Sequence, residues 1–214
     1  MPDPDLTLYA ESSWMSPWVF HAMIALEEKG LPYKLEVVPI PIPKDRRADL
    51  EKRAVIGKVP VLVHGELAFG ESLAISEYLA EQFPFPDHPR LFPADLGKRA
   101  RARQVMSMAR TSMFALRADR PTSGVFGRPS IRPLSEKAKA EASELVRIAS
   151  VLVTPNSRHL FGDDWCIADV DLSLLLMRLI AHEDPVPQYV IDYALRQWDR
   201  KSVKRFIAHL PTSP

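Results

Sequence analysis

The sequence predicts an α/β domain followed by an all-helical domain. Three observations predict this division: apolar residues alternate over short segments only in the first third of the chain, apolar residues follow helical spacing after residue 94, and four prolines stand between the two regions. The chain has 214 residues, of which 46% are hydrophobic and 26% charged, which suits two small domains with separate cores. We expect the first domain to span 1–83, a stiff linker 84–94 and the second domain 95–214.

The first part of the α/β domain predicts a strand, a helix and a second strand. Residues 6–9 alternate and indicate a strand, and Ser16 followed by Pro17 is a favoured start for a helix. Gly30 suits the left-handed position at the end of that helix. Residues 33–38 alternate again, so the unit is β-α-β with parallel strands.

The second part of this domain predicts a hairpin and a helix. Residues 48–53 form only a weak helical pattern. Two strands at 59–63 and 67–69 are joined by the turn 64–66, which indicates an antiparallel hairpin, and 71–83 follows as a helix. The order is therefore β-α-β followed by β-β-α.

The second domain predicts only helices. We expect them at 95–116, 135–153, 167–181, 189–195 and 202–210. Glycines and prolines in 120–134 indicate a loop between the first two.

Composition excludes several classes of function. A net charge of +1 gives no electrostatic basis for binding nucleic acid or a membrane surface, and no segment approaches the ~20 apolar residues of a membrane span. The single cysteine, Cys166, precludes a disulfide within the chain and fits a reducing compartment, so we expect a cytoplasmic protein. The six histidines lack ligand spacing, so we expect no metal.

Val59-Pro60 is the first candidate binding element. From this dipeptide alone a trans bond is expected, because only about 5–6% of X–Pro bonds are cis. The alternative, a cis bond, would turn the backbone of Val59 toward a ligand, where it could pair with an extended peptide.

Glu71-Ser72 is the second candidate, where a strand gives way to a helix. The structural interpretation makes Ser72 the N-cap and Glu71 an acid near the positive end of the helix dipole. The functional interpretation adds that the helix N-terminus binds a carboxylate while Glu71 holds an ammonium, as an amino-acid-like ligand requires.

Ser16 is the third candidate. It is expected to cap the first helix, and its hydroxyl could also donate a hydrogen bond to a thiolate. A thiol with a pKa near ~8.5 is mostly neutral at pH 7, and lowering it by two units needs about 2.7 kcal/mol, which one charged hydrogen bond and a helix dipole could supply.

Several motifs in order resemble the cytosolic glutathione transferase family. They are residues 6–9, 16–18, 24–33, 58–62 and 71–79, followed by 161–162 and 167–171. Arg99 to Arg103 and Gln197 to Arg200 are similar to the bacterial YfcF-like group of that family. The resemblance covers almost the whole chain and implies a thioredoxin-like α/β domain that binds glutathione, followed by an all-helical domain that binds a second substrate.

The resemblance also implies roles for the candidate residues. Val59-Pro60 would be cis, with Val59 on the cysteinyl backbone of glutathione, while Glu71 and Ser72 would hold the γ-glutamyl end. Lys58, and less directly Lys44, would face the glycine carboxylate.

The same resemblance makes Ser16 the residue that activates the thiol. Ser12 and Ser13 remain rivals, because the activating group varies in position within this loop. No cysteine lies near position 16, so disulfide-exchange chemistry is not expected.

Contacts with the second substrate are expected from Trp14, Arg110, Met113 and Arg117. The alternative for the arginines is a solvated or paired surface position. Met15 and Trp18 could add to the apolar wall of this site, but core packing is the preferred interpretation for Trp18. At the cap of the helix from 167, Cys166 stands where the family has Ser or Thr, so we expect Asp169 to cap back to the main chain and Cys166 to be a buried thiol.

The predicted function is a serine-type glutathione transferase that attacks an electrophile, reduces an organic peroxide, or both. Glutathione would be the co-substrate, and a homodimer is expected. The alternatives are a non-catalytic ligand-binding or protein-docking module, and a glutathione-dependent cis–trans isomerase.

Overall fold

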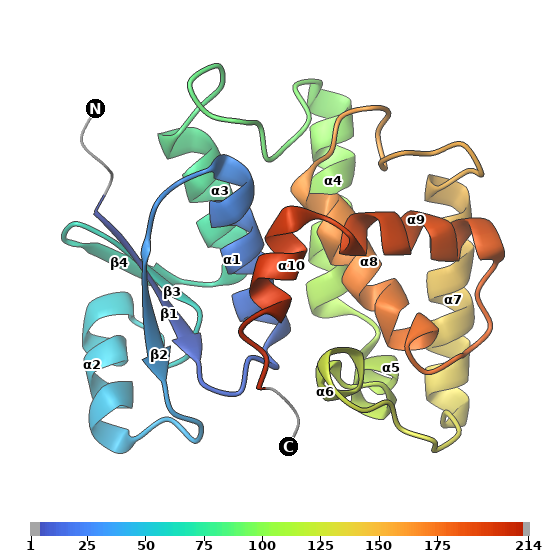
Figure 1. The fold of residues 1–214 in the computed structure, drawn as a ribbon, viewed down its shortest axis with the longest axis horizontal. Helices are drawn as coiled ribbons and strands as arrows, with labels where there is room; N and C mark the ends of the chain where they lie inside the picture. Colours follow the sequence, from blue (N-terminus) through green and yellow to red (C-terminus); the bar gives the residue numbers. More distant parts are fainter. Residues whose placement is uncertain (1–4, 212–214) are drawn as a thin grey trace. The chain divides into compact units, whose positions relative to one another are not determined.

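The computed structural model describes residues 5–211 in two compact units (Figure 1). One unit runs up to Leu91 and includes the segment from Arg205, and the other runs from Phe92 to Lys204. The predicted domain ranges 1–83 and 95–214 extend to residues 1–4 and 212–214, which lie outside the described residues. The exact domain boundaries stay a prediction.

The first unit is an α/β domain with a four-stranded mixed sheet. Its elements are β1 (Leu6–Glu11), α1 (Pro17–Lys29), β2 (Lys34–Val38), α2 (Lys44–Ala54), β3 (Val61–His64), β4 (Leu67–Gly70) and α3 (Ser72–Gln82). The strand order is β2-β1-β3-β4, with β1 parallel to β2 and the other pairs antiparallel. The predicted parallel pair and the predicted hairpin are both confirmed.

Alternation along the strands sends apolar side chains to both faces of this sheet. Val61 and Val63 pack with Leu50 of α2 on one face. Leu62 therefore points to the opposite face, where it pairs with Leu8, and both are fully buried. Helices α1 and α3 pack against each other on that second face, while α2 covers the first (Figure 1).

Two differences in extent from the sequence prediction have a clear physical reason in this unit. The third strand begins at Val61 rather than Val59, because Pro60 has no N–H to donate to the ladder. The weak pattern at 48–53 belongs to a longer helix, α2, which the packing of Leu50 on the sheet stabilises beyond its local propensity.

The second unit is helical, as predicted. Its elements are α4 (Leu96–Thr111), α5 (Phe114–Asp119), α6 (Thr122–Phe126), α7 (Glu136–Leu152), α8 (Ile167–Ile180), α9 (Gln188–Trp198) and the beginning of α10 (Lys201–Ile207). Every residue of α8 from Ile167 to Leu179 is buried, and α4, α7 and α9 pack around it (Figure 1). A mostly apolar helix is typical of such a central position, and the polar residues Asp169, Asp171 and Arg178 of α8 are buried with it.

The predicted single helix at 95–116 is wrong. It is interrupted after Thr111, because Met113 has a left-handed backbone with φ of 60°, and α5 starts afterwards. The Leu116 N–H of α5 donates to Glu141 of α7 over 2.8 Å. The predicted loop 120–134 also contains α6, a helix of 5 residues.

The cap of α8 follows the expectation. Asp169 accepts hydrogen bonds from Cys166 N at 2.9 Å, Leu160 N at 2.8 Å and the Tyr193 hydroxyl at 2.7 Å. Cys166 is 1% exposed, and burial raises the pKa of its thiol. Cys166 is thus a buried thiol at a structural position.

Candidate functional site

One cavity in the α/β unit brings together five of the residues predicted to bind a ligand. Its volume is about 140 Å³, and its lining consists of Trp18, Ile56, Lys58, Val59, Pro60, Glu71 and Ser72. These residues come from the first turn of α1, the segment between α2 and β3, and the start of α3. The cavity therefore lies where three separate segments of the fold meet.

The segment before β3 contributes Lys58, Val59 and Pro60 to the cavity lining. The Val59-Pro60 bond is cis, as the family resemblance implied and contrary to the trans bond expected from the dipeptide alone. The β1–β3 ladder reaches Val61, opposite Tyr9, so Val59 lies just beyond it. An extended peptide can pair with backbone in such a position as an added strand.

The start of α3 presents one acidic side chain and a helix N-terminus. The N-cap is Glu71, with φ of 67° and no side-chain capping bond, so the prediction of Ser72 as N-cap is wrong. Ser72 is the first helical residue and is 2% exposed. A positive φ is unusual for a residue as large as Glu, and such conformations are held where the surrounding structure requires them.

The charges lining the cavity suit a zwitterionic peptide. Glu71 and Lys58 form no side-chain hydrogen bond or ion pair with any described residue, so both charges are available to a ligand. The first N–H groups of α3 lack partners within the helix and carry the positive end of its dipole. Together these groups can bind an ammonium and more than one carboxylate.

Ser16 caps the helix that carries Trp18 into the cavity. Its hydroxyl oxygen accepts a hydrogen bond from Val19 N at 3.3 Å, and its own N–H donates to Glu11 Oε1 over 2.8 Å. Ser16 therefore directly precedes the helical turn whose Trp18 forms part of the cavity wall. The predicted capping role of Ser16 is confirmed.

The two rival serines are engaged differently. The backbone N–H of Ser12 donates to Val38 O over 2.9 Å, which joins the loop to β2. Ser13 donates to Glu11 Oε2 from both its N–H, over 2.6 Å, and its hydroxyl, over 2.5 Å. The hydroxyl proton of Ser13 is thus directed at a carboxylate.

Sequence reasoning missed two residues of this region, Ile56 and Glu11. Ile56 lines the cavity, and so does Trp18, for which core packing was preferred over a place in the wall of the second-substrate site. Glu11 organises the loop before α1. The available signal for Glu11 was a charged residue at the end of an alternating apolar strand, immediately before Ser-Ser.

Three predicted residues of the α/β unit, Ser16, Lys44 and Trp14, are not among the residues that line the cavity. Lys44 is the first residue of α2 and is exposed. Trp14 is 6% exposed, stacks on His209 with ring centroids 4.3 Å apart and meets Phe206 edge-on at 5.6 Å. In the described structure Trp14 is packed by the carboxy-terminal segment of its own unit.

Arg110, Met113 and Arg117 are brought together at the junction of α4 and α5 in the helical unit. Arg110 forms an ion pair with Asp171 and donates to Met106 O over 2.8 Å. Arg117 donates to Arg110 O over 3.2 Å, and burial, followed by the neighbouring charge of Arg110, lowers its pKa. Met113 is 6% exposed at the break between the helices.

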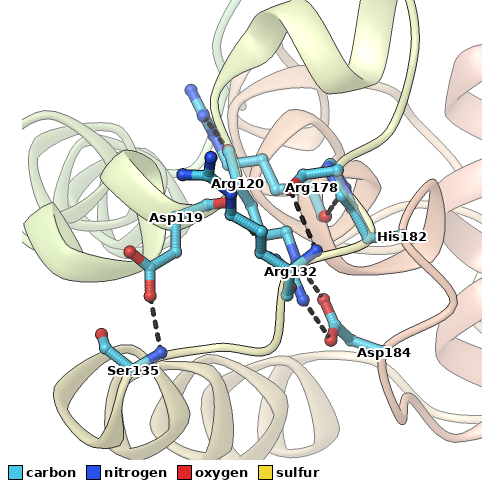
Figure 2. A network of polar contacts seen from close by, with 8 residues as sticks. Asp119, Arg120, Arg132, Ser135, Arg178, His182 and Asp184 are labelled. Atoms are coloured by element: carbon cyan, nitrogen blue, oxygen red, sulfur yellow. Dashed lines mark hydrogen bonds and ion pairs between the residues drawn. The ribbon is translucent and has the colours of Figure 1, made fainter.

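A polar network anchors the residues that follow α5 (Figure 2). Arg120 donates to both carboxylate oxygens of Asp184, over 2.7 and 3.0 Å. Arg178 of α8 donates to Arg120 O over 2.6 Å, and Ser135 N donates to Asp119 over 2.7 Å. These contacts join α5, the start of α7 and the end of α8.

Among residues 5–211, no group of three or more His, Cys, Asp or Glu side chains is placed to hold a metal ion. Within the same range, no helix has the length and apolar character needed to span a bilayer.

Both parts of the chain match families of known proteins. Residues 15–82 match the family described as "Glutathione S-transferase, N-terminal domain". Residues 95–211 match "Glutathione S-transferase, C-terminal domain".

Individual relatives are similar over most of the chain. Glutathione S-transferase Z1 of Arabidopsis thaliana is 31% identical over 78% of this chain and 74% of its own. Maleylacetoacetate isomerase of Rattus norvegicus is 30% identical over 76% and 73%. A solved glutathione transferase homolog from Burkholderia, with bound glutathione, is 33% identical and superposes with a TM-score of 0.79 over 95% of this chain and 97% of its own.

Proposed function

This chain belongs to the glutathione S-transferase family, and from that premise we propose that it is a serine-type glutathione transferase. It binds glutathione in the cavity of the α/β unit and activates the thiol with Ser16 for attack on an electrophile, an organic peroxide, or both. The observation that carries the proposal is that Lys58, Val59, Glu71 and Ser72 line one cavity together with Trp18, which belongs to the first turn of the helix that Ser16 caps.

Each end of glutathione has a matching group in the proposed complex. The α-ammonium of the γ-glutamyl residue meets Glu71, and its α-carboxylate meets the N-terminus of α3 at Ser72. The cysteinyl backbone pairs with Val59 beside Pro60. Lys58 faces the glycine carboxylate, and Lys44 is proposed to add charge at longer range.

Thiol activation follows from one hydrogen bond and one dipole. The Ser16 hydroxyl donates to the sulfur, and the positive end of α1 stabilises the anion, so the thiol proton leaves to solvent on binding. The thiolate then forms a carbon–sulfur bond with an electrophile and expels its leaving group. With a peroxide the thiolate attacks one oxygen and the O–O bond breaks, which gives a sulfenic acid and an alkoxide that takes a proton from solvent to become an alcohol. A second glutathione then converts the sulfenic acid to disulfide and water.

Glutathione binding is measured by calorimetry on wild type and Glu71→Ala. We expect Glu71→Ala to weaken binding about 10- to 100-fold, because an ammonium loses a charged partner. Glu66→Ala removes an exposed acid from the β3–β4 turn and is the matched control, with wild-type affinity expected. Equal affinities in all three proteins would reject the proposed site.

The activating serine is tested by conjugation and peroxidase assays on Ser16→Ala beside Ser13→Ala. Loss of one hydrogen bond to the thiolate should lower kcat/KM of Ser16→Ala about 10- to 100-fold, with glutathione affinity preserved. Ser13→Ala should keep most of its activity. Full activity in Ser16→Ala rejects its assignment.

A second candidate function is glutathione-dependent cis–trans isomerisation. The similarity to maleylacetoacetate isomerase of Rattus norvegicus favours it. The thiolate would add to one carbon of the double bond, the remaining single bond would rotate, and the thiolate would leave again. Ser12-Ser13-Trp14 lacks the cysteine of the Ser-Ser-Cys signature expected for that class, and isomerase assays with a maleyl substrate decide between the two.

Several narrower expectations remain proposals. They are membership of the YfcF-like group, a homodimer, a cytoplasmic location, and second-substrate contacts by Trp14, Arg110, Met113 and Arg117. A non-catalytic ligand-binding or docking role is the alternative, and measurable turnover excludes it.

A further inference from the structure

The side chain of Glu11 is buried at the end of β1, directly before the loop that carries the candidate serines. It is 4% exposed, and within the described structure it forms no ion pair. A buried carboxylate without a cation must be stabilised by hydrogen bonds, since its transfer from water is otherwise very costly.

Four donors of the following loop supply those hydrogen bonds. Glu11 Oε2 accepts from Ser13 N at 2.6 Å, the Ser13 hydroxyl at 2.5 Å and Trp14 N at 2.8 Å, while Oε1 accepts from Ser16 N at 2.8 Å. Backbone N–H groups that converge on one anion form a concave nest. The loop is therefore wrapped around this carboxylate.

The loop needs such an anchor because its backbone is strained. Trp14 has a φ of 56°, which is rare for a large side chain. His209 and Phe206 pack against the Trp14 ring, and Glu11 accepts a hydrogen bond from the Trp14 backbone N–H. Conformations of this kind persist only where several contacts agree.

This arrangement leaves the hydroxyls of Ser13 and Ser16 in opposite states. A serine hydroxyl has one proton to donate. The Ser13 hydroxyl donates its hydrogen bond to Glu11 Oε2, whereas the Ser16 hydroxyl accepts a hydrogen bond from Val19 N and has its own proton available to a ligand. Ser16 is also fixed at its own N–H by Glu11.

We propose that Glu11 is the positioning residue of this site: it orients Ser16 as the hydrogen-bond donor to the thiolate and withholds Ser13 from that role. This inference rests on the proposed function, because it concerns the same serine. Glu11 acts through the loop and does not itself touch the substrate.

A purely electrostatic role of Glu11 and a positioning role predict different pKa values for the bound thiol. If Glu11 acted only as a nearby negative charge, its removal would lower the pKa of the bound thiol. If Glu11 positions Ser16, the variant Glu11→Gln should raise that pKa, because the amide nitrogen of Gln faces backbone donors and at least one of them loses its acceptor. The two interpretations therefore predict shifts of opposite sign.

The experiment is a pH titration of the ultraviolet thiolate difference spectrum of bound glutathione, together with pH profiles of kcat/KM. We expect Glu11→Gln to raise the thiol pKa by about one unit and to lower kcat/KM about tenfold below it, with glutathione affinity within about threefold of wild type. Glu36→Gln, which neutralises an exposed acid on β2, is the matched control and should leave both profiles unchanged. An unchanged or lowered thiol pKa in Glu11→Gln overturns the proposal.

A second variant keeps the test decisive should Glu11→Gln fail to fold. Ser13→Ala removes one bond to Glu11 and leaves its three backbone bonds in place, so the thiol pKa should stay within about 0.3 unit of wild type. A rise in Ser13→Ala as large as in Ser16→Ala overturns the assignment of the two hydroxyls. If glutathione fails to bind wild type, or if Ser16→Ala is fully active, the proposed function itself fails, whereas a normal Glu11→Gln beside an impaired Ser16→Ala removes only the role of Glu11.

Discussion

Truncation of Asp169 should be among the most destabilising single changes in the helical unit. The carboxylate is fully buried and accepts from Leu160 N, Cys166 N and the Tyr193 hydroxyl. Asp169→Ala would leave these three buried donors without their acceptor. At about 1–3 kcal/mol for each unsatisfied group, offset in part by removal of a buried charge, we expect a loss of about 3–5 kcal/mol.

Ser135→Ala supplies the matched comparison. Ser135 also caps a long helix, but it is exposed and its hydroxyl accepts one bond, from Ala138 N at 3.3 Å. A cap of that kind contributes about 1 kcal/mol. The contrast between the two variants therefore measures burial and bond number rather than capping as such.

Unfolding in urea is monitored by circular dichroism, and the slope of unfolding free energy against urea concentration is compared between variants. Asp169→Asn keeps one acceptor oxygen and should fall between wild type and Asp169→Ala, which maintains the test if the alanine variant does not fold. An unfolding free energy of Asp169→Ala no lower than that of Ser135→Ala would refute the reasoning.

Two further predictions concern buried charge in the helical unit. Among the described residues the Arg178 side chain makes one hydrogen bond, to a carbonyl, and burial lowers its pKa to about 10. Arg178→Met should therefore change the unfolding free energy by less than about 1 kcal/mol. Arg120→Met removes the cation that pairs with Asp184 and should cost about 3–5 kcal/mol in the same assay. Burial raises the pKa of Asp171 to about 6, although Arg110 opposes this, so the folded state keeps a proton that the unfolded state loses near 3.8. The contribution of Asp171 to the unfolding free energy should therefore decrease as pH rises from about 4 to 6, by at most about 3 kcal/mol. The measurement compares the urea midpoints of wild type and Asp171→Asn across that pH range. Parallel pH profiles of the two proteins would contradict the prediction.

Much of the candidate site was predictable from local sequence. Ser16-Pro17 specifies a helix start by itself, because a capping hydroxyl and a residue without N–H are the groups that a helix N-terminus accommodates. Lys58, Val59, Pro60, Glu71 and Ser72 were named from motif order, and one cavity contains them all.

The departures arose from an unusual backbone conformation in one case and from a distant contact in the other. Ser72 has good capping chemistry, yet the left-handed backbone of Glu71 moves the cap one position earlier. The pattern at 95–116 is continuous, but the chain turns at Met113 and α5 is stabilised by Glu141 of α7. Local spacing carries no information about such contacts.

The sequence alone determined the division into an α/β and a helical part, the parallel pair β1–β2, the hairpin β3–β4 and the cap of α8, because periodicity and capping act over a few residues. Only the tertiary structure decided that Glu11 is buried and that the Ser13 hydroxyl donates to it while the Ser16 hydroxyl does not. From sequence alone a glutamate is expected to be an exposed charge. Glu11 can be buried because the folded chain brings three of its own backbone N–H groups to the carboxylate.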